Sequence, residues 1–215
     1  MMDVFAHDSR LEMQNTRLEE IGSAAAGIAH DINNQLILIL NHLATPDLEG
    51  ARVAASRCTA LTKSLLSYCR GESLALRSID LGEFIHDFVD SLSLPNAVQL
   101  TVDLPTKPLP VKADPAALAR VLTNLVSNGV DAMRGVGSLR IAVSDGRMEI
   151  RDSGPGITRE HAKRIFEPFF STKGKQGTGL GLAIVREIMR QHGGSVSVES
   201  EPGRGAAFIL RFRSA

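Results

Sequence analysis

Residues 114–133 read DPAALARVLTNLVSNGVDAM, and their pattern decides much of the fold. Asp114 followed by Pro115 is a typical helix start, because a short acidic side chain caps the first amides and proline fits the first turn. The other faces of this helix are leucine and valine, but one stripe is polar: Asn124, Asn128 and Asp131, at positions i, i+4 and i+7.

Three stacked polar side chains beside an apolar core are costly unless a ligand or an ion satisfies them. Amide and carboxylate oxygens suit Mg²⁺ and the phosphates that it bridges. The stripe therefore predicts a site for a metal and phosphate groups. Asparagines satisfied by water or by capping bonds are the alternative.

Two glycine-rich segments follow. In DSGPGI (152–157), an aspartate precedes a tight turn that allows the close approach of a flat ligand. In STKGKQGTGLGL (171–182), the glycines lead into a helix whose first amides, with Lys173 or Lys175, suit a phosphate. The second segment is not a P-loop, because it lacks the closing Gly-Lys-Ser/Thr. Taken alone, either segment is also compatible with a plain turn or linker.

Helices and strands alternate from residue 73 to residue 215. We expect a helix capped by Asp80 that runs through Leu94, and another that ends at His192 before two glycines. The expected strands are 98–104, 109–114, a 137–154 hairpin turning at Asp145-Gly146, 194–200 and 206–213. This order predicts an α/β sandwich with helices on one face of a mixed sheet.

The N-terminal part has a different pattern. Apolar residues recur in steps of three and four at Leu18, Ile21, Ala25, Ile28, Ile32, Leu36, Ile39 and Leu43. Pro46 and Asp47 end this helix and start a second, which runs to about Arg70. A hairpin cannot bury two apolar stripes alone, so we expect a homodimeric four-helix bundle. The predicted fold class is α+β, with domains over 1–72 and 73–215.

The first of these helices carries AHDINNQL (29–36). His30 lies on the face opposite the apolar seam, and its neighbours Ala26 and Gly27 are small, so a large partner can reach the imidazole. Asp31 can accept a hydrogen bond from one ring nitrogen and leave the other as a nucleophile. Asn34 lies one turn from His30 and points at the same partner. A solvated histidine and a solvated amide without a role are the alternatives.

Composition excludes several classes. The 215 residues carry a formal net charge of zero, so no basic field suggests a nucleic-acid partner. The longest aliphatic run, 36–40, is too short to span a membrane, and the N-terminus lacks the order of a signal peptide. We expect a cytoplasmic protein without a membrane span.

Taken in order, these motifs resemble the core of a two-component sensor histidine kinase. AHDINNQL resembles its phosphoacceptor box, NLVSNGVDAM (124–133) its asparagine box and DSGPGI its first glycine box. IFEPFFSTK (165–173) resembles its phenylalanine box, and GTGLGLAIV (177–185) its second glycine box. Five motifs in this order are far more specific than any one of them. The catalytic half is similar to the ATP-binding fold of gyrase, the ninety-kilodalton heat-shock chaperones and mismatch-repair ATPases.

The resemblance implies a role for each matching residue. His30 would be the phosphoacceptor, Asp31 its base or orienting carboxylate, and Asn34 would hold a water for dephosphorylation of a partner. Asn128 would bind Mg²⁺, Asn124 would lie near the phosphates, and Asp152 would contact the adenine amino group. The remaining expected nucleotide contacts are Asp131, Gly154, Gly156, Lys173, Gly177, Thr178, Gly179, Leu180 and Gly181.

The expected function is ATP-dependent phosphorylation of His30 and transfer of the phosphoryl group to an aspartate in the receiver domain of a response regulator. A separate sensory partner, or a sensor domain in a longer chain, would supply the input. Two alternatives stay open: an inactive phosphotransfer or scaffold protein, and a chaperone-type ATPase in which His30 is incidental. The intact asparagine, aspartate and glycine set argues against the first, and the HDINN turn against the second.

Overall fold

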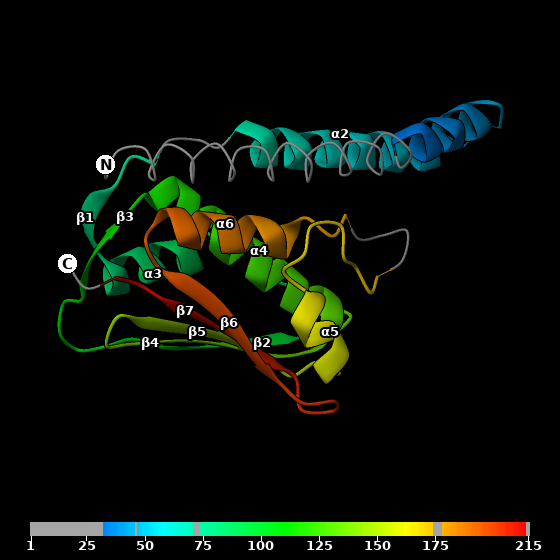
Figure 1. Ribbon diagram of the computed structural model, residues 1–215. Helices are drawn as coiled ribbons and strands as arrows, with labels where there is room; N and C mark the ends of the chain where they lie inside the picture. The colour runs from blue at the N-terminus through cyan, green and yellow to red at the C-terminus, as the bar shows by residue number, and fades with distance from the viewer. Residues whose placement is uncertain (1–31, 46, 71–73, 174–177, 214–215) are drawn as a thin grey trace. The chain divides into compact units, whose positions relative to one another are not determined.

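The computed structural model of the chain describes residues 32–45, 47–70, 74–173 and 178–213 (Figure 1). They belong to two units, with the boundary between Glu72 and Ser73. Among the described residues, no helix combines the length and apolar character needed to cross a membrane.

The described part of the first unit is helical. Residues 32–43 form a helix, a turn follows at 44–45, and α2 spans Leu48–Arg70. Asp47 caps α2, because its Oδ1 accepts a hydrogen bond from the Gly50 backbone N–H at 2.9 Å. The predicted break between the helices and the predicted end near Arg70 are confirmed. The part of the first helix predicted before residue 32 lies outside the described residues.

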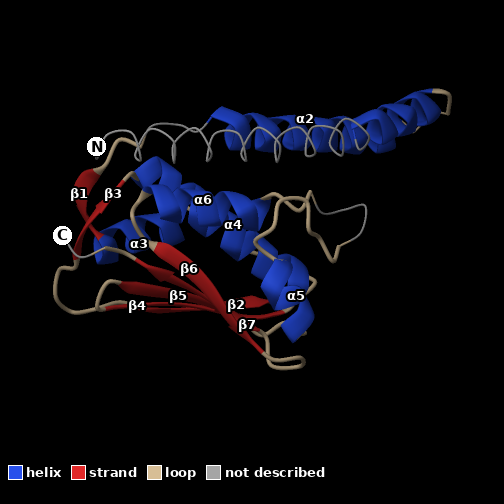
Figure 2. Ribbon diagram, in the orientation of Figure 1, coloured by secondary structure: helices blue, strands red, loops and turns tan. Residues whose placement is uncertain are grey.

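The second unit is built on a five-stranded sheet in the order β2-β4-β5-β7-β6 (Figures 1 and 2). Only β2 and β4 pair in parallel; the other neighbours are antiparallel. The predicted mixed sheet is therefore confirmed. Its strands are β2 (Val98–Asp103), β4 (Gly137–Ser144), β5 (Arg147–Asp152), β6 (Ser195–Ser200) and β7 (Ala206–Arg211).

Helices α4 (Pro115–Ala132) and α6 (Gly181–Gln191) pack on one face of this sheet and against each other (Figure 2). The core between them and the sheet is apolar, as the alternation of the strands predicts. Its most deeply buried side chains include Leu118, Leu122, Leu125, Leu139, Ile141, Met148, Ile150, Leu180 and Met189.

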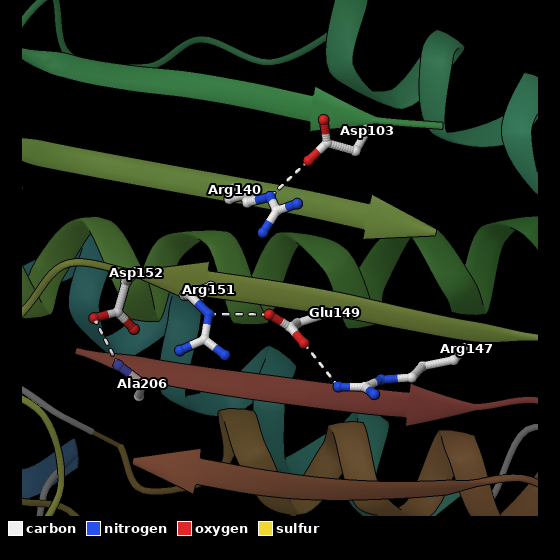
Figure 3. Close-up of polar contacts among 7 residues, drawn as sticks. All are labelled: Asp103, Arg140, Arg147, Glu149, Arg151, Asp152 and Ala206. Atoms are coloured by element: carbon white, nitrogen blue, oxygen red, sulfur yellow. Dashed lines mark hydrogen bonds and ion pairs between the residues drawn. The ribbon is translucent and has the colours of Figure 1, made fainter. Parts of the chain in front are cut away.

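The opposite face of the sheet is charged. Alternate residues of β4 and β5 point there, and Figure 3 shows how they pair. Arg140 contacts Asp103 at 2.5 Å, and Glu149 lies between Arg147 at 2.7 Å and Arg151 at 2.9 Å. The period of two thus separates a solvated ionic face from the core.

The structure confirms a helix cap, a hairpin turn and a helix end that were predicted from local sequence. Asp114 caps α4 by accepting from the backbone N–H groups of Ala116 at 2.9 Å and Ala117 at 3.1 Å. The β4–β5 hairpin turns at Asp145 and Gly146, with φ of 47° and 70°, as a type I′ turn requires. His192 ends α6, and its Nε2 accepts from the Asp114 backbone N–H at 3.0 Å.

One boundary prediction was wrong. Helix α3 spans Leu81–Asp90 and ends four residues before Leu94. The Ser91 hydroxyl donates to the Phe88 carbonyl at 2.7 Å, which ends the helix with a side-chain bond. In addition, Pro95 disfavours a helical conformation at the residue before it.

Two elements were not predicted. Strand β1 (Arg77–Asp80) pairs with β3 (Pro110–Ala113) in a separate two-stranded sheet. The short helix α5 (Arg159–Arg164) is capped by Thr158, whose Oγ1 accepts from the His161 N–H at 3.3 Å. Both elements are too short to show a hydrophobic period in sequence.

Candidate nucleotide-binding site

A pocket of about 510 Å³ opens in the second unit between α4, the end of β5, α5 and the start of α6. The polar stripe of α4 forms one wall. Of the fifteen site residues predicted from the sequence, nine line this pocket: Asn124, Asn128, Asp131, Asp152, Gly156, Lys173, Thr178, Gly179 and Gly181. The structure thus brings together segments that lie far apart in the sequence.

The asparagine stripe turns its oxygens toward the neighbouring loop and helix. Asn124 donates from Nδ2 to the Arg120 carbonyl at 2.8 Å, and its Oδ1 faces Gly181. A Cβ on Gly181 would lie 2.9 Å from that oxygen, so a larger residue there would force the Asn124 side chain to move.

Asn128 and Asp131 already hold a positive group. The Lys173 ammonium donates to Asn128 Oδ1 at 3.1 Å and to Asp131 Oδ2 at 2.8 Å. This pair of oxygens fits a cation, because an ammonium lies between them and both are hard oxygen donors of the kind Mg²⁺ prefers. No group of three acidic, histidine or cysteine side chains that could hold a metal occurs in the described part of the chain. A metal here would therefore need ligands from a bound molecule or water as well.

Asp152 is the buried carboxylate of the pocket, with a relative exposure of 7%. Its Oδ1 accepts from the backbone N–H of Gly154 at 2.8 Å and of Ala206 at 3.4 Å, the latter drawn in Figure 3. Within the described residues Oδ2 accepts no hydrogen bond. Burial raises the pKa of this carboxyl; the backbone N–H groups of Gly154, Ala206 and Asp152 itself, and the charge of Arg151, oppose the rise without cancelling it. The site thus holds an acceptor aimed at a donor outside the chain.

Glycines let the backbone close around Asp152. A Cβ on Gly154 would lie 2.8 Å from Asp152 Oδ1, and one on Gly205 would collide with the Asp152 carbonyl oxygen. Gly156 has φ of 74°, and a Cβ there would collide with the Glu201 carbonyl oxygen. Gly154 and Gly156 were predicted from their motif, whereas Gly205 was missed because nothing near it in sequence marks its contact.

The loop before α6 supplies the opposite edge. Gly179 has φ of 65°, and its carbonyl accepts from the Phe169 N–H at 2.9 Å. Leu180 is fully buried at the N-terminus of α6, where no side chain caps the first amides. Uncapped helix amides with the dipole behind them form a binding site for an anion. Gly177 lies outside the described residues.

His161, Ile165 and Phe170 are among the lining residues that received no role from the sequence. The Phe170 ring lies 4.5 Å from the Arg164 guanidinium and meets the His161 ring edge-on at 5.6 Å. These contacts tie α5 to the loop. The signal was present in IFEPFF, but an aromatic cluster alone does not distinguish a pocket wall from a core.

Three predicted site residues belong to the first unit. His30 and Asp31 lie outside the described residues. Asn34 is described, is half-buried, and makes an interaction within the structure.

The second unit is similar in sequence and fold to known proteins. Residues 113–215 match the family described as "Histidine kinase-, DNA gyrase B-, and HSP90-like ATPase". The second unit is thus an ATP-binding domain of this class.

Similar proteins show which family within this broad ATPase class the chain belongs to. The sensor histidine kinase ZraS of Klebsiella oxytoca is 39% identical over 90% of this chain and 46% of its own length. The sensor kinase CckA of Brucella abortus (strain 2308) is 33% identical over 92% of this chain and 24% of its own. The catalytic domain of histidine kinase ThkA is 30% identical, with 66% of this chain and 97% of that domain covered and a TM-score of 0.56. The chain belongs to the sensor histidine kinase family.

A further solved structure is that of ThkA in complex with the response regulator protein TrrA. The match covers 100% of this chain and 68% of the ThkA chain, with 25% sequence identity and a TM-score of 0.80. The chain spans less than half the length of the curated relatives named above.

Proposed function

We propose that the chain is the core of an ATP-dependent protein-histidine kinase. It would transfer the γ-phosphoryl group of ATP to His30 and then to an aspartate of a response regulator. The observation that carries this proposal is the pocket in which buried Asp152 faces the asparagine stripe of α4 and the uncapped start of α6. Membership of the sensor histidine kinase family supports it.

The nucleotide would bind with its base at Asp152 and its phosphates at α6. Asp152 Oδ2 is suited to accept from the adenine amino group, because Oδ1 is already held by backbone N–H groups. The first amides of α6, with Gly179, Thr178 and Lys173 beside them, suit the phosphates. Asn124 Oδ1 lies next to Gly181 and so close to the same region.

Mg²⁺ would bind at Asn128 Oδ1, with phosphate oxygens completing its ligands. The Lys173 ammonium beside Asn128 and Asp131 supports this, because the two oxygens accommodate a positive charge. When bound, the metal neutralises charge on the phosphates. Asn128→Ala should therefore abolish Mg²⁺-dependent ATP binding and leave the fold intact, measured by calorimetry and circular dichroism. Unchanged ATP affinity in this variant would contradict the assignment.

At the phosphoacceptor, His30 would attack the γ-phosphorus with one ring nitrogen. The P–N bond forms as the bond from phosphorus to the β,γ-bridging oxygen breaks, and ADP leaves with that electron pair. Asp31 would hold the other ring nitrogen and accept its proton. The reaction consumes ATP, so a cytoplasmic location is part of the proposal.

Incubation with γ-labelled ATP and Mg²⁺ separates this function from its two rivals. Label on the protein that is acid-labile and base-stable, and is lost in His30→Gln, identifies a histidine kinase. His86→Gln is the matched control, since His86 is an exposed histidine on α3. Free phosphate alone would indicate a chaperone-type ATPase. If neither labelled protein nor free phosphate forms, the result would indicate a scaffold protein.

The first unit would form a four-helix bundle with a second copy of the chain. Residues 32–43 expose a stripe of large apolar side chains at positions i, i+4 and i+7, which isolated soluble helices rarely do. They are Leu36, Leu40 and Leu43, with 46%, 66% and 56% relative exposure. Burial against a second hairpin would remove this surface from water.

The second partner would be a response regulator, as in the ThkA complex. Asn34 follows His30 by four residues, so on a continuous helix its carboxamide would face the docked receiver domain. There it could hold a water in line with the aspartyl phosphate, which makes the chain a phosphatase as well. Asn34→Ala should keep His30 labelling and slow loss of phosphate from the regulator about tenfold or more. Asn41→Ala, an exposed amide on the same helix, is the control; equal rates in both variants would remove this role from Asn34.

A further inference from the structure

Lys173 contacts two residues of the α4 polar stripe, Asn128 and Asp131, across the pocket. It follows the phenylalanine-rich segment, and its side chain, 35% exposed, reaches across to α4. There its ammonium donates to Asn128 Oδ1 at 3.1 Å and to Asp131 Oδ2 at 2.8 Å. The two acceptors lie 45 and 42 residues away in sequence.

We propose that the Lys173 ammonium occupies the cation position at Asn128 and Asp131, and that a divalent cation displaces it. The inference rests on the proposed function, because it concerns the metal ligand assigned there. It adds that the Lys173 ammonium competes with the metal for this position. Once displaced, the ammonium binds the phosphates.

The contact with Asn128 sets this arrangement apart from an ordinary surface ion pair. An ion pair with Asp131 alone would satisfy the lysine charge, and exposed pairs of that kind contribute little. An ammonium has donors only, so it selects the carbonyl oxygen of Asn128 and turns Nδ2 away. Nδ2 does lie on the other side, 3.7 Å from where a Gly181 Cβ would be. Lys173 therefore also orients the amide for metal binding.

The two cations cannot share this position. A divalent cation binds oxygen at about 2.1 Å, so on Asn128 Oδ1 it would lie within a few ångströms of the ammonium. At that distance two positive groups repel strongly unless negative charge lies between them. Metal entry thus drives Lys173 off Asn128, and the phosphates of a bound nucleotide are the anionic partners within reach of the pocket edge. The consequence is a site that binds metal weakly until nucleotide supplies both metal ligands and a new partner for Lys173.

The test measures metal binding without catalysis. Mn²⁺, a paramagnetic substitute for Mg²⁺, is titrated into nucleotide-free protein and followed by water-proton relaxation. Lys173→Met keeps the apolar stem and removes the competing charge. It should bind Mn²⁺ about tenfold more tightly than the unaltered chain. The same variant should bind metal-free ADP several-fold more weakly, because it has no ammonium that could move from α4 to the phosphates.

Three controls separate occupancy of the site from a general field effect. Lys112→Met removes the same charge from an exposed position on β3 and should change neither affinity. Asn128→Ala introduced into Lys173→Met should abolish the gain in Mn²⁺ affinity. The gain should persist at about 1 M KCl, where the Debye length is about 3 Å and distant charges are screened.

Equal Mn²⁺ affinities for Lys173→Met and the unaltered chain would overturn the competition. A gain that vanishes in high salt, or that survives Asn128→Ala, would overturn it as well. A different result would contradict the proposed function, namely that the unaltered chain does not bind ATP. Intact Mg²⁺-dependent ATP binding with unaltered Mn²⁺ affinity in Lys173→Met would therefore reject this inference alone.

Discussion

At the scale of single residues, Asp152 carries the most specific chemistry. Its carboxylate is buried, its Oδ1 is held by two backbone N–H groups, and Oδ2 accepts nothing within the described chain. Oδ2 is therefore available to accept a hydrogen bond from a ligand in the pocket.

Asp152→Asn should weaken ATP binding about tenfold to a hundredfold at neutral pH, because a hydrogen bond to a charged acceptor contributes about 1.5–3 kcal/mol. The pH dependence follows from the raised pKa of this carboxyl. A ligand amino group needs the ionised form, so ATP affinity should be full above the raised pKa and fall as pH drops through it. Calorimetric titration across this range checks the prediction. Asp103→Asn, on the open face of the sheet, should retain the affinity of the unaltered chain; an equal loss there would argue against a specific contact.

The stability of the nucleotide-free protein should depend on the ionisation of Asp152 in the opposite direction: it should fall as pH rises. A folded-state pKa above the ordinary value of 3.8 means that the fold binds the proton more tightly than the unfolded chain. The Asp152 carboxyl thus contributes fully to the free energy of unfolding at pH values below its pKa in the unfolded chain. This contribution is lost as pH rises through its pKa in the folded protein.

At the scale of elements, the turn between β6 and β7 offers a matched pair of glycines. Gly203 and Gly205 both have positive φ, of 81° and 73°. A Cβ on Gly203 would meet nothing within 4 Å, whereas one on Gly205 would collide with the Asp152 carbonyl oxygen.

Gly203→Ala should lower the free energy of unfolding by about 1–2 kcal/mol, the cost of a left-handed conformation. Gly205→Ala should lower it by about 3 kcal/mol or more, since steric overlap adds to the same strain. Urea denaturation of both variants measures the difference. Similar midpoints would mean that the turn moves away from Asp152 without cost.

The cap of α4 is a second element with a clear test. Burial opposes ionisation of Asp114, but bonds from the backbone N–H groups of Ala117, Ala75 and Ala116 outweigh it, and the pKa of this carboxyl is lowered. Its contribution to stability is thus present above the unfolded pKa and lost as pH falls through the folded pKa, below 3.8.

Asp114→Ala should lower the free energy of unfolding by about 1–2 kcal/mol, as expected for loss of a capping side chain. Asp114→Asn keeps a capping oxygen, so it should lose much less and should no longer respond to acid through this group. Denaturant titrations at neutral and acidic pH distinguish the two variants. A full loss in Asp114→Asn would show that charge, rather than capping geometry, stabilises α4.

At the scale of the whole molecule, the central prediction is self-association through the first unit. Leu40→Glu places a charge in the middle of the exposed leucine stripe and should raise the dimer dissociation constant about a hundredfold or more. Sedimentation of both proteins over a concentration series checks this. Val136→Glu alters an apolar side chain of the same 66% exposure in the second unit and should leave the oligomeric state unchanged. Equal association in Leu40→Glu and the unaltered chain would contradict a bundle built on this stripe.

The sequence alone determined the features that depend on neighbouring residues. The Asp114–Pro115 helix start, the turn at Asp145-Gly146 and the end of α6 at His192 were predictable because caps and turns are local interactions. The polar stripe of α4 was predictable for the same reason, since helical periodicity alone places its members on one face.

Only the tertiary structure decided what depends on distant contacts. The insertion of β7 between β5 and β6, the approach of Gly205 to Asp152 and the reach of Lys173 to Asn128 each join segments far apart in the chain. No local pattern encodes them, because each results from packing of the sheet and helices around a shared core. The short elements β1 and α5 belong here too: they are too brief to show a period, and pairing and capping within the fold define them.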